Sequence, residues 1–600
     1  MTDKATKVHG IVVDYSRDNL FDELGLKRLK DGYMKSDETS PQERFAFVSK
    51  FFSSNKEHAQ RLYDYSSQHW LSYSTPILSH GRNKRGLGIS CFLSFMEDSS
   101  SGLIDTLSEV NWLSMFGGGI GVHVRIRGAD DKSVGVMPHM KTYDASCLAY
   151  KQGSTRRGSY ATYLDISHPD IIQFIEMRKP TGDQNQRCLN LHHGINMSDK
   201  FMSIIERCMI DPEADDTWEL INPNNPSVIV DKVSAKELWM KIIDLRMQTG
   251  EPYLQFIDTA NEGMPEFQKK LGLKIHGSNL CSEIQLPTNS ERTAVCCLSS
   301  LNLEYYDKWK DNYQFYKDVE EMLDNVLTFF IRESPDEIQR ARFSAKRERS
   351  IGIGTLGFHS YLQQHNIPFD CALSKSTNMR IFKNIRKQLD KSNLELGAER
   401  GEAPDAKGTG LRNSHVMAIA PNASSSQIMG NVSPSIEPLR ANAFRQETLS
   451  GSHIHKNKYL DKLLRSKLED EKDYEDAWMN IIANDGSCMG LKCLTDEEKD
   501  VFKTAMEIDQ QWVIDLASDR QKHIDQGQSV NLFFRPDSNI KYIHAVHFLA
   551  WKMGLKALYY CRSDTARKAD KVSMKIERRI IEELDMKKVA EGDVCIACEG

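Results

Sequence analysis

Three functional groups stand at two-residue spacing in the stretch GSNLCSEI: the amide of Asn279, the thiol of Cys281 and the carboxylate of Glu283. Pro287 follows and favours an extended conformation before it. Alternate side chains of an extended chain share a face, so the spacing predicts that the three groups point one way. Such a set suits a diol-like substrate, with the carboxylate accepting a hydroxyl proton. The thiol could act as a nucleophile, or it could donate and accept hydrogen atoms. The alternative interpretation of the whole stretch is an ordinary strand with one polar face.

Three further cysteines lie in apolar runs that predict strands. Cys296 and Cys297 are neighbours in TAVCCLSSLNL, and Cys91 lies in GLGISCFLSF. Neighbours on a strand face opposite sides, so only one of Cys296 and Cys297 can enter a shared pocket. Free cysteine is among the most buried residue types, and the alternative is that all three are small packing residues.

The segment HVMAIAPNASSSQIMGN combines an apolar run, a turn of small hydroxyl residues and a short helical pattern. Pro421 ends the apolar run, and Ser424, Ser425 and Ser426 stand where the helical pattern begins. Free backbone N–H groups at a helix start, beside hydroxyl side chains, suit a phosphate group. A plain helix cap is the alternative.

The C-terminal region holds two more pairs of reactive residues. Tyr559 stands beside Tyr560 in ALYYC, an apolar run in which adjacent aromatic residues usually pack. Cys595 and Cys598 form a CxxC pair, a spacing shared by redox dithiols and by half of a zinc site. A tetrahedral zinc site needs four ligands, whereas the last forty residues contain no histidine and only one other cysteine, Cys561. The redox dithiol is therefore preferred.

Periodicity predicts the elements that must position these groups. Residues 1 to about 70 have helical periodicity. From there to Tyr560, short β-branched runs alternate with longer helical patterns, which favours an α/β architecture with a central sheet or barrel. The remainder predicts a charged tail with one amphipathic helix. The joint MFGGGIGV does not suit a dinucleotide-binding loop, because VHVRIR after it predicts a strand rather than a helix.

Composition limits the classes of protein. The 600 residues carry a formal net charge of −6, with 40% hydrophobic and 27% charged residues, which is typical of a soluble globular protein and does not suggest nucleic-acid binding. No apolar run approaches the roughly 20 residues that cross a bilayer, and MTDKATKVHG lacks the apolar region of a secretory signal. Thirteen cysteines are too sparse for a disulfide scaffold in a chain of this length. We therefore expect a cytoplasmic protein that does not engage membranes.

Five separated stretches, in this order, resemble the large, catalytic subunit of class I ribonucleotide reductase: NLCSEIQLPT, AVCCLS, APNASSSQIMGN, LYYC and the CxxC pair. STPILSHG, MFGGGIGVHVRIRG and GLRNS fit the same family. The resemblance implies an α/β fold, a ten-stranded barrel of two five-stranded halves with a finger loop inside. A small helical domain at 1–70 would precede the barrel at 71–565, and a flexible tail at 566–600 would carry the redox CxxC. The implied activity is the reduction of ribonucleoside diphosphates to 2′-deoxyribonucleotides by thiyl-radical chemistry, for DNA precursor synthesis.

The resemblance also implies a role for each reactive residue of the barrel. Cys281 would form the thiyl radical that removes the ribose 3′ hydrogen, with Glu283 as base for the 3′ hydroxyl and Asn279 as its hydrogen-bonding partner. Cys91 and Cys296 would deliver the reducing equivalents and end as a disulfide. The neighbouring cysteine at 297 would then face outward.

The C-terminal pairs acquire roles in the same way. Tyr559 and Tyr560 would relay the radical from a metal-containing β subunit, and a stacked pair requires a break in the strand because strand neighbours face opposite sides. Cys595 and Cys598 would re-reduce the active site and then be reduced by thioredoxin or glutaredoxin. About 35 residues separate Tyr560 from Cys595, an extended reach of roughly 115 Å. No covalently bound cofactor is implied.

Substrate and effector contacts are implied as well. Asp98 and Arg127 would contact dNTP or ATP effectors, with Mg²⁺, and the loop KQGSTRRGSYA would carry the effector signal to the substrate site. Family members usually form homodimers. The residues that match substrate-contacting positions, the last four of them at the phosphate, are Thr75, Ser90, Gly119, Asn422, Ala423, Ser424 and Ser425.

The chain departs from the family pattern in two ways, and three other classes of protein are alternatives. Only about 90 residues precede Cys91, so we expect neither an N-terminal ATP-cone nor control by dATP through one. Cys561 directly follows the tyrosine pair and has no role in the pattern. The adenosylcobalamin-dependent class shares the barrel and the reactive cysteines but makes its radical within one chain, whereas the tyrosine pair favours a partner subunit. The terminal stretch VCIACEG is a poor match to the loop expected near the end of a glycyl-radical enzyme. The alternative from another class of protein is a non-catalytic metal-binding scaffold with the CxxC as ligand.

Overall fold

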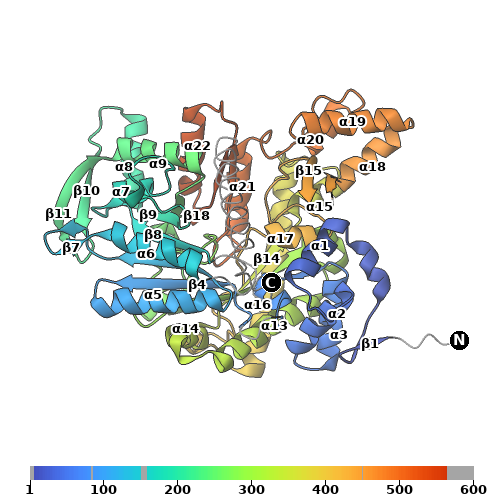
Figure 1. Ribbon diagram of the computed structural model, residues 1–600, viewed down its shortest axis with the longest axis horizontal. Coiled ribbons are helices and arrows are strands. Elements are labelled where there is room, and N and C mark those ends of the chain that lie inside the picture. The colour runs from blue at the N-terminus through green and yellow to red at the C-terminus, as the bar shows by residue number, and fades with distance from the viewer. Residues whose placement is uncertain (1–5, 83–85, 151–157, 449–450, 564–600) are drawn as a thin grey trace, which may run out of the picture.

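The computed structural model describes residues 6–82, 86–150, 158–448 and 451–563. The chain forms a helical N-terminal part, a barrel and a small insertion (Figure 1). None of the described helices is both long enough and apolar enough to cross a membrane. Three predictions fall outside the described residues: the tail at 566–600 with its amphipathic helix, the CxxC pair at Cys595 and Cys598, and the part of the effector loop at 151–157.

The N-terminal part is mainly helical, as its periodicity predicts. The Ser40 hydroxyl caps the second helix and the Glu43 carboxylate binds the Ser40 backbone in return, which fixes where this helix begins. The chain then enters the barrel through a short strand and a helical turn. The elements of this part are β1 (Lys7–Val8), β2 (Ile11–Val12), α1 (Glu23–Gly32), α2 (Pro41–Phe51), α3 (Lys56–Ser67), β3 (Leu71–Tyr73) and α4 (Thr75–Leu78).

Five parallel strands form the first half of the barrel, in the order β4 (Cys91–Glu97), β5 (Gly119–Arg125), β8 (Tyr160–Asp165), β9 (His192–Met197) and β12 (Tyr253–Phe256). The predicted strand VHVRIR falls in β5 and is confirmed. These strands are almost entirely buried because both of their faces are covered. The connecting elements are α5 (Ser100–Met115), β6 (Ala129–Asp130), β7 (Ser133–Val134), α6 (Val136–Ala149), α7 (Ile171–Glu176), α8 (Asp199–Ile210), β10 (Thr217–Asn222), β11 (Asn225–Ser234) and α9 (Ala235–Thr249).

The second half joins the first through antiparallel pairs at both edges. β13 (Ala294–Asn302) pairs with β4, and β18 (Ala557–Leu558) pairs with β12, while β14 (Ile351–Leu356) runs parallel to β13. The helices of this half are α10 (Ile257–Glu262), α11 (Glu266–Lys270), α12 (Tyr306–Trp309), α13 (Tyr313–Glu333), α14 (Gln339–Glu348), α15 (Phe358–Gln364), α16 (Ala372–Arg400), α21 (Gln510–Gln521) and α22 (Ile540–Lys552).

Two extended segments, 415–420 and 526–530, close the ring although neither is a regular strand. The first accepts a backbone hydrogen bond from Ile353 of β14 (N···O 2.8 Å). The second accepts one from Ile419 (3.0 Å) and one from Tyr559, which follows β18 (2.8 Å). Eight strands follow one another in the continuous sheet, so the two segments complete a ten-stranded ring. The expected barrel of two five-stranded halves is confirmed.

Residues 277–285, between β12 and β13, form the finger loop, which contacts both halves from inside the barrel. The Tyr163 hydroxyl of β8 donates to the carbonyl of Asn279 (2.6 Å), and Gly527 N–H donates to another carbonyl of the loop (2.8 Å). A Cβ atom on Gly121 of β5 would lie 1.8 Å from the Ser278 carbonyl oxygen, so only glycine fits there. The glycine-rich stretch MFGGGIGV therefore leaves space for the finger loop.

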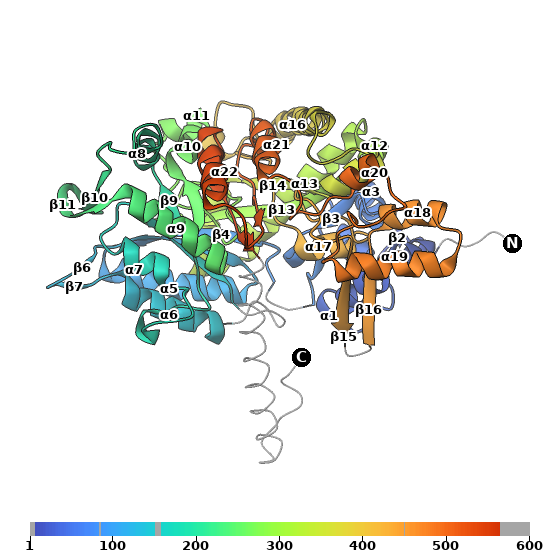
Figure 2. The same cartoon turned by 90° about the horizontal axis from the view of Figure 1, so that it is seen from above.

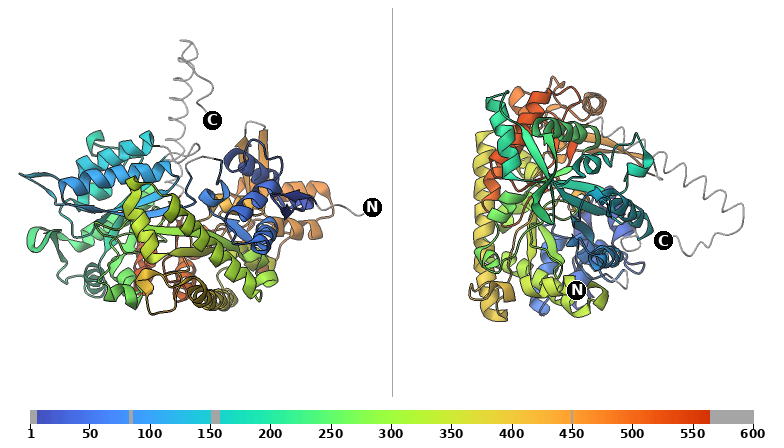
Figure 3. Two further views of the ribbon diagram at one scale, coloured as in Figure 1. Left: turned by 90° about the horizontal axis from the view of Figure 1, so that it is seen from below. Right: turned by 90° about the vertical axis from the view of Figure 1, so that its left-hand side faces the viewer.

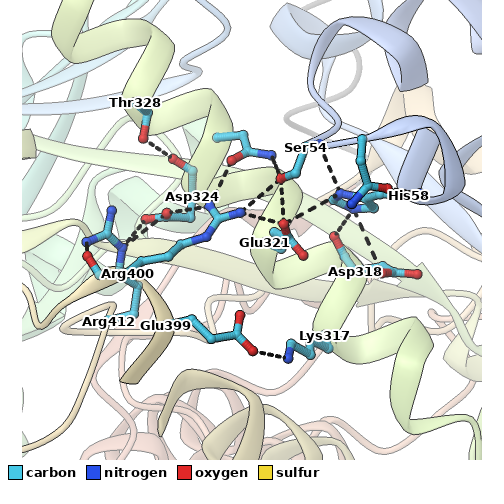
Figure 4. Close-up of polar contacts among 12 residues, drawn as sticks. Ser54, His58, Lys317, Asp318, Glu321, Asp324, Thr328, Glu399, Arg400 and Arg412 are labelled. Carbon is cyan, nitrogen blue, oxygen red and sulfur yellow. Dashed lines mark hydrogen bonds and ion pairs between the residues drawn. The ribbon is translucent and has the colours of Figure 1, made fainter. Parts of the chain in front are cut away.

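Helix α13 ties the N-terminal part to the barrel through buried carboxylates (Figure 4). Asp318 accepts two hydrogen bonds from Arg61 of α3 (2.6 and 2.8 Å). One turn and a half further along the helix, Asp324 accepts from Arg400 at the end of α16 and from Arg412 (both 3.0 Å). These ion pairs hold α3, α13 and α16 together.

A small insertion with its own hydrophobic core lies beside the N-terminal helices (Figures 2 and 3). Its core includes Leu464, Trp478 and Phe502, and Asn442 at its start donates to the carbonyl of Phe502 (2.7 Å). Its elements are β15 (Ala443–Thr448), β16 (Gly451–Lys456), α18 (Lys458–Lys467), α19 (Glu471–Ala483) and α20 (Asp496–Val501). Outside the insertion, β17 (Leu532–Phe534) and β19 (Cys561–Ser563) pair in parallel.

Candidate active site

A cavity of about 330 Å³ lies between the N-terminal part, the finger loop and the second half of the barrel. Asn279, Cys281 and Glu283 of the finger loop line it, together with Cys91 at the start of β4. All residues that match substrate-contacting positions line it as well: Thr75, Ser90, Gly119, Asn422, Ala423, Ser424 and Ser425. Segments that are far apart in the sequence thus meet at one cavity.

The stretch GSNLCSEI forms a turn, and the prediction of an extended strand is wrong. Ser282 has a φ of 66°, in the left-handed region, and its N–H donates to the Asn279 carbonyl (3.3 Å). The turn persists because side chains of the barrel bind its backbone: Tyr163 donates to the Asn279 carbonyl (2.6 Å), and Ser529 donates to the Cys281 carbonyl (2.6 Å). The three functional side chains therefore reach the cavity from a turn instead of from one face of a strand.

Cys91 lies among the other reactive groups. The Asn279 amide donates to Cys91 Sγ (3.3 Å), and the Cys91 thiol lies 3.9 Å from Glu283 Oε1. Cys296 stands directly opposite Cys91 in the antiparallel pairing of β13 with β4. Opposed residues in such a pair have Cα atoms about 4.5–5.5 Å apart, within the range of a disulfide. An amide, a carboxylate and two thiols therefore meet at this point.

Burial sets the protonation of these groups. It raises the pKa of Glu283 to about 7, against hydrogen bonds from Asn279 and Ser529 that lower it. Burial also raises the pKa of Cys91 and of Cys296, and the nearby Glu283 carboxylate adds to both shifts. Both cysteines are therefore thiols at neutral pH, and Glu283 is poised to accept or release a proton there.

Tyr559 connects Cys281 to Tyr560. The Tyr559 hydroxyl donates to Cys281 Sγ (3.6 Å), and the two tyrosine rings have centroids 4.3 Å apart at an interplanar angle of 54°. The pair occupies the gap between β18 and β19, so the predicted break in the strand is present. The rings pack on a third buried ring, that of Tyr253, with centroids 4.7 and 5.1 Å away.

The serine-rich turn leads into helix α17 (Ala423–Ile428). Asn422 adopts a left-handed φ of 54°, which asparagine tolerates better than most residues. Its amide donates to the carbonyl of Thr355 (3.0 Å), and its side-chain oxygen accepts from Ser300 (3.2 Å). Ser424 and Ser425 line the cavity with the first turn of this helix, which offers N–H and hydroxyl donors to a phosphate group.

Three side chains that hold the reactive groups lie outside every motif of the sequence. Tyr163 and Ser529 bind the finger-loop turn, and Ser529 also donates to Glu283 Oε2 (3.3 Å). Gln526 donates to Cys296 Sγ (3.3 Å). These residues lie 116 to 248 positions from their partners, so no local spacing relates them.

Two nearby cysteines face away from the cavity. Cys297 packs in the main hydrophobic core, whereas Cys296 belongs to a small cluster around Cys91. This confirms the outward orientation predicted for Cys297. Cys561 is also buried in the main core, with its sulfur 3.6 Å from Met247 Sδ.

Asp98 and Arg127 meet away from this cavity, at the carboxyl ends of β4 and β5. Arg127 Nε donates to Asp98 Oδ2 (2.8 Å), and Asn224 in the β10–β11 turn also donates to Asp98. The parallel pairing of β4 and β5 brings these ends together. The loop expected to communicate with them is described only from residue 158 onward.

Among the described residues, one group of three has side-chain donor atoms spaced as in a metal site: His58, Asp318 and Glu321, within 4.8 Å of one another. His58 Nδ1 accepts from Ser54 N–H (3.2 Å), and its Nε2 lies 3.0 Å from the Asp318 carbonyl oxygen. The Asp318 carboxylate accepts two hydrogen bonds from Arg61 (2.6 and 2.8 Å). The group is therefore a hydrogen-bonded part of the α3–α13 contact.

Comparisons with known proteins agree with this geometry. The chain matches the family model for the ribonucleotide reductase barrel domain over residues 89–408 and 404–561, and that for the ribonucleotide reductase all-alpha domain over 19–86. It is 52% identical to the ribonucleoside-diphosphate reductase large subunit of Invertebrate iridescent virus 3, covering 94% of this chain and 97% of that protein. It is 45% identical to the putative ribonucleoside-diphosphate reductase large subunit of Frog virus 3, over 92% of this chain and 94% of that protein. Among solved structures it resembles the class Id ribonucleotide reductase alpha subunit of Actinobacillus ureae, with a TM-score of 0.79 and 35% identity over 91% of this chain and 97% of the other.

Proposed function

The chain belongs to the family of ribonucleotide reductase large subunits, and we propose that it reduces ribonucleoside diphosphates to 2′-deoxyribonucleotides by thiyl-radical chemistry. The position of Cys281 carries this proposal. Its sulfur accepts a hydrogen bond from Tyr559 (3.6 Å), while its side chain lines the same cavity as Cys91 and Glu283. The thiol thus has a phenol for radical exchange beside it and a base and a reducing thiol across the cavity. The names of the relatives support diphosphates as substrates.

The first half of the reaction generates a substrate radical. The radical passes from Tyr560 to Tyr559, which then takes the hydrogen atom of the Cys281 thiol. The Cys281 thiyl radical removes the 3′ hydrogen of the ribose. Glu283 accepts the proton of the 3′ hydroxyl, and Asn279 hydrogen-bonds to the same part of the sugar. The buried position and raised pKa of Glu283 support its role as a base that works near neutral pH.

The second half reduces the 2′ carbon. Cys91 and Cys296 together supply two electrons and two protons, the 2′ hydroxyl leaves as water, and a disulfide forms between the two sulfurs. Cys281 then returns a hydrogen atom to the 3′ carbon and becomes a thiyl radical again, while Glu283 returns the proton to the 3′ oxygen. The balance is one ribonucleotide and one dithiol converted to one deoxyribonucleotide, one disulfide and one water. The cross-strand pairing of Cys91 with Cys296 supports this step, because it places the two within disulfide reach.

The pH dependence of the chemical step tests the role of Glu283. Burial raises its pKa to about 7, and the residue accepts a proton only when it is ionised. The single-turnover rate of CDP reduction is therefore expected to fall about tenfold per pH unit below pH 7 and to level off above it. Rapid-quench assays with the β subunit at pH 5.5 to 8.5 measure this decline of the rate. A Glu283→Gln variant whose rate declines in the same way below pH 7 would assign the titration to another group.

We also propose that a separate β subunit with a metal centre supplies the radical. The tyrosine pair supports this, because a radical generated beside Cys281 would need no relay through Tyr559 and Tyr560. Reduction of the active-site disulfide by Cys595 and Cys598, and of these by thioredoxin or glutaredoxin, stays a prediction, since the terminal pair lies outside the described residues.

Asp98 and Arg127 are proposed to bind dNTP or ATP effectors. Their hydrogen-bonded contact is partly exposed and lies at the start of α5, away from the catalytic cavity. Different dNTPs are expected to change the preference between CDP and GDP by about fivefold or more, which is the usual scale of allosteric coupling. The preference is measured by competitive reduction of mixed substrates. Unchanged preference with every dNTP, or an unchanged response in Arg127→Ala, would contradict the assignment.

We propose that two copies of the chain associate through α5 and α6, which lie side by side on the outside of the first half (Figures 1 and 2). Ile104 on α5 is 68% exposed and Leu148 on α6 is 49% exposed. Exposed apolar side chains on neighbouring helices indicate an interface. Ile104→Glu is expected to shift the dimer to monomers in sedimentation velocity, whereas Ile210→Glu is the matched control, because Ile210 on α8 is 82% exposed and outside this surface. An Ile104→Glu chain that remains dimeric would contradict this interface.

A further inference from the structure

The two sulfurs that the proposed chemistry joins in a disulfide have different surroundings. Cys91 is 7% exposed and lines the catalytic cavity. Cys296 is 0% exposed and packs in a small cluster that includes Leu298 and Ala418. Strand β14 runs beside it, and a Cβ atom on Gly352 of this strand would lie 3.1 Å from Cys296 Sγ. A thiol that enters the cavity can therefore reach Cys91, whereas packed side chains and β14 enclose Cys296.

The amide of Gln526 contacts the enclosed sulfur and is itself 0% exposed. Its Nε2 donates to Cys296 Sγ (3.3 Å) and to the Ile351 carbonyl (3.0 Å). Its Oε1 accepts from the Gln285 N–H (3.3 Å). The reversed amide would set oxygen against a carbonyl and nitrogen against an N–H, so these two backbone partners fix its orientation. Nε2 carries two hydrogens: one binds the Ile351 carbonyl, and the second faces Cys296, with the Ser350 hydroxyl 3.4 Å from the nitrogen.

The two sulfurs also differ in how well they would hold a negative charge. Cys91 accepts from the Asn279 amide (3.3 Å), but its thiolate would stand 3.9 Å from Glu283 Oε1, and two negative charges repel at this distance. Burial raises the pKa of Cys296, and the hydrogen bond from Gln526 is the largest of the effects that lower it. In thiol–disulfide exchange, the sulfur that holds charge better leaves faster. Cys296 is therefore the better leaving group.

We propose that an incoming thiolate attacks Cys91 when the active-site disulfide is reduced, and that Cys296 is the sulfur that leaves. Gln526 is a catalytic residue of this step, because its amide donates to the departing Cys296 thiolate. This inference rests on the proposed function, which forms the disulfide in each turnover.

The exchange takes two steps. In the first, the thiolate of one reducing cysteine, Cys595 or Cys598, forms a bond to Cys91 Sγ. The bond between Cys91 and Cys296 breaks, and Cys296 leaves with the electron pair and takes up the proton that the attacking thiol released. In the second, the other reducing thiolate attacks the sulfur now bound to Cys91, and Cys91 leaves and is protonated in turn. The reducing pair ends as a disulfide and the active site as two thiols.

A purely structural role for Gln526 is the competing explanation. Its contacts with Ile351 and Gln285 join the segment 526–530 to β14 and to the finger loop. Loss of turnover in a variant would not separate the two roles, because either one would lower it. The exchange at the two sulfurs must therefore be followed directly.

The site of attack is tested with the chain that carries Cys595→Ser and Cys598→Ser, oxidised by a single turnover of CDP with the β subunit. 2-Mercaptoethanol is added, the reaction is quenched with acid, and peptic peptides are analysed by mass spectrometry. The adduct is expected on Cys91, with Cys296 recovered as a thiol. An adduct mainly on Cys296 would overturn the proposal, a result that needs no variant of Gln526. If no disulfide joins Cys91 to Cys296 after the turnover, the proposed function fails instead.

The role of Gln526 is tested by the rate at which 2-mercaptoethanol reduces this disulfide. Gln526→Met keeps a similar volume without a donor, and Gln526→Glu keeps the shape with a carboxylate. Each is expected to slow the reduction by about tenfold or more, the scale of one hydrogen bond to a charged group. Gln528→Met is the matched control, because Gln528 lies on the same segment, is 2% exposed and donates to the Ala517 carbonyl (2.9 Å). Its rate is expected to stay within about twofold. An unchanged rate in either Gln526 variant, or an equal loss in Gln528→Met, would overturn the role of Gln526.

Discussion

Replacing Cys281 by serine is expected to stop nucleotide reduction, lowering turnover by at least about a thousandfold. Losses on this order or larger follow removal of the group that forms the reactive intermediate of an enzyme. Serine occupies almost the same volume, but its O–H bond is too strong for the Tyr559 radical to break. The turn itself should persist, because Tyr163 and Ser529 bind its backbone carbonyls. Turnover is measured as conversion of CDP to dCDP with the β subunit and dithiothreitol.

Cys297→Ala is the matched control for this variant. Cys297 lies on the same strand as Cys296 but packs in the main core, away from the cavity. Its loss is expected to lower the free energy of unfolding by roughly 1 kcal/mol and to leave kcat within about twofold. A Cys281→Ser chain that retains turnover would contradict the proposal that a Cys281 thiyl radical starts the reaction.

Replacing Tyr559 by phenylalanine is expected to lower turnover by about a thousandfold or more while leaving the fold and the binding of CDP unchanged. Phenylalanine keeps the ring packed against Tyr253 and Tyr560, whose centroids lie 4.7 and 4.3 Å away. It removes only the hydroxyl that donates to Cys281 Sγ at 3.6 Å. That phenol is the group with which Cys281 is proposed to exchange a hydrogen atom. Turnover with the β subunit and equilibrium binding of CDP are the two measurements.

The Tyr559→Phe variant also separates the two classes that share this barrel. If the chain alone reduced nucleotides when given adenosylcobalamin, and did so equally well with phenylalanine at 559, the radical would arise within one chain. The proposed β subunit and relay would then both be wrong. Full turnover of Tyr559→Phe with the β subunit would leave the β subunit in place and remove Tyr559 from the radical path.

Motif spacing predicted the members of the site better than their conformation. Asn279, Cys281 and Glu283 do reach one cavity, as their spacing predicts, yet they do so from a turn. Two-residue spacing is compatible with several backbone shapes, and the turn is set by Tyr163 and Ser529, which lie more than a hundred residues away. Contacts of this kind leave no local pattern in a sequence.

Only part of the barrel was predictable, because only its regular strands have a local pattern in the sequence. Alternating strand and helix patterns indicated an α/β fold, and strands such as β5 and β13 appeared where expected. The extended segments 415–420 and 526–530 complete the ring through only a few backbone hydrogen bonds, so they lack the long β-branched runs by which strands are predicted. Gly121 is required because Ser278 passes beside it, and this contact leaves no local pattern in the sequence.

The most direct test of the account is a single turnover with an excess of β subunit and no added reductant, followed by peptide mass spectrometry. Cys595→Ser and Cys598→Ser substitutions in the same chain prevent exchange with the terminal pair. One dCDP is expected for each new disulfide, and this disulfide is expected to join Cys91 to Cys296. Formation of dCDP with both of these cysteines still present as thiols, or no dCDP with a β subunit that is active with another large subunit, would contradict this expectation.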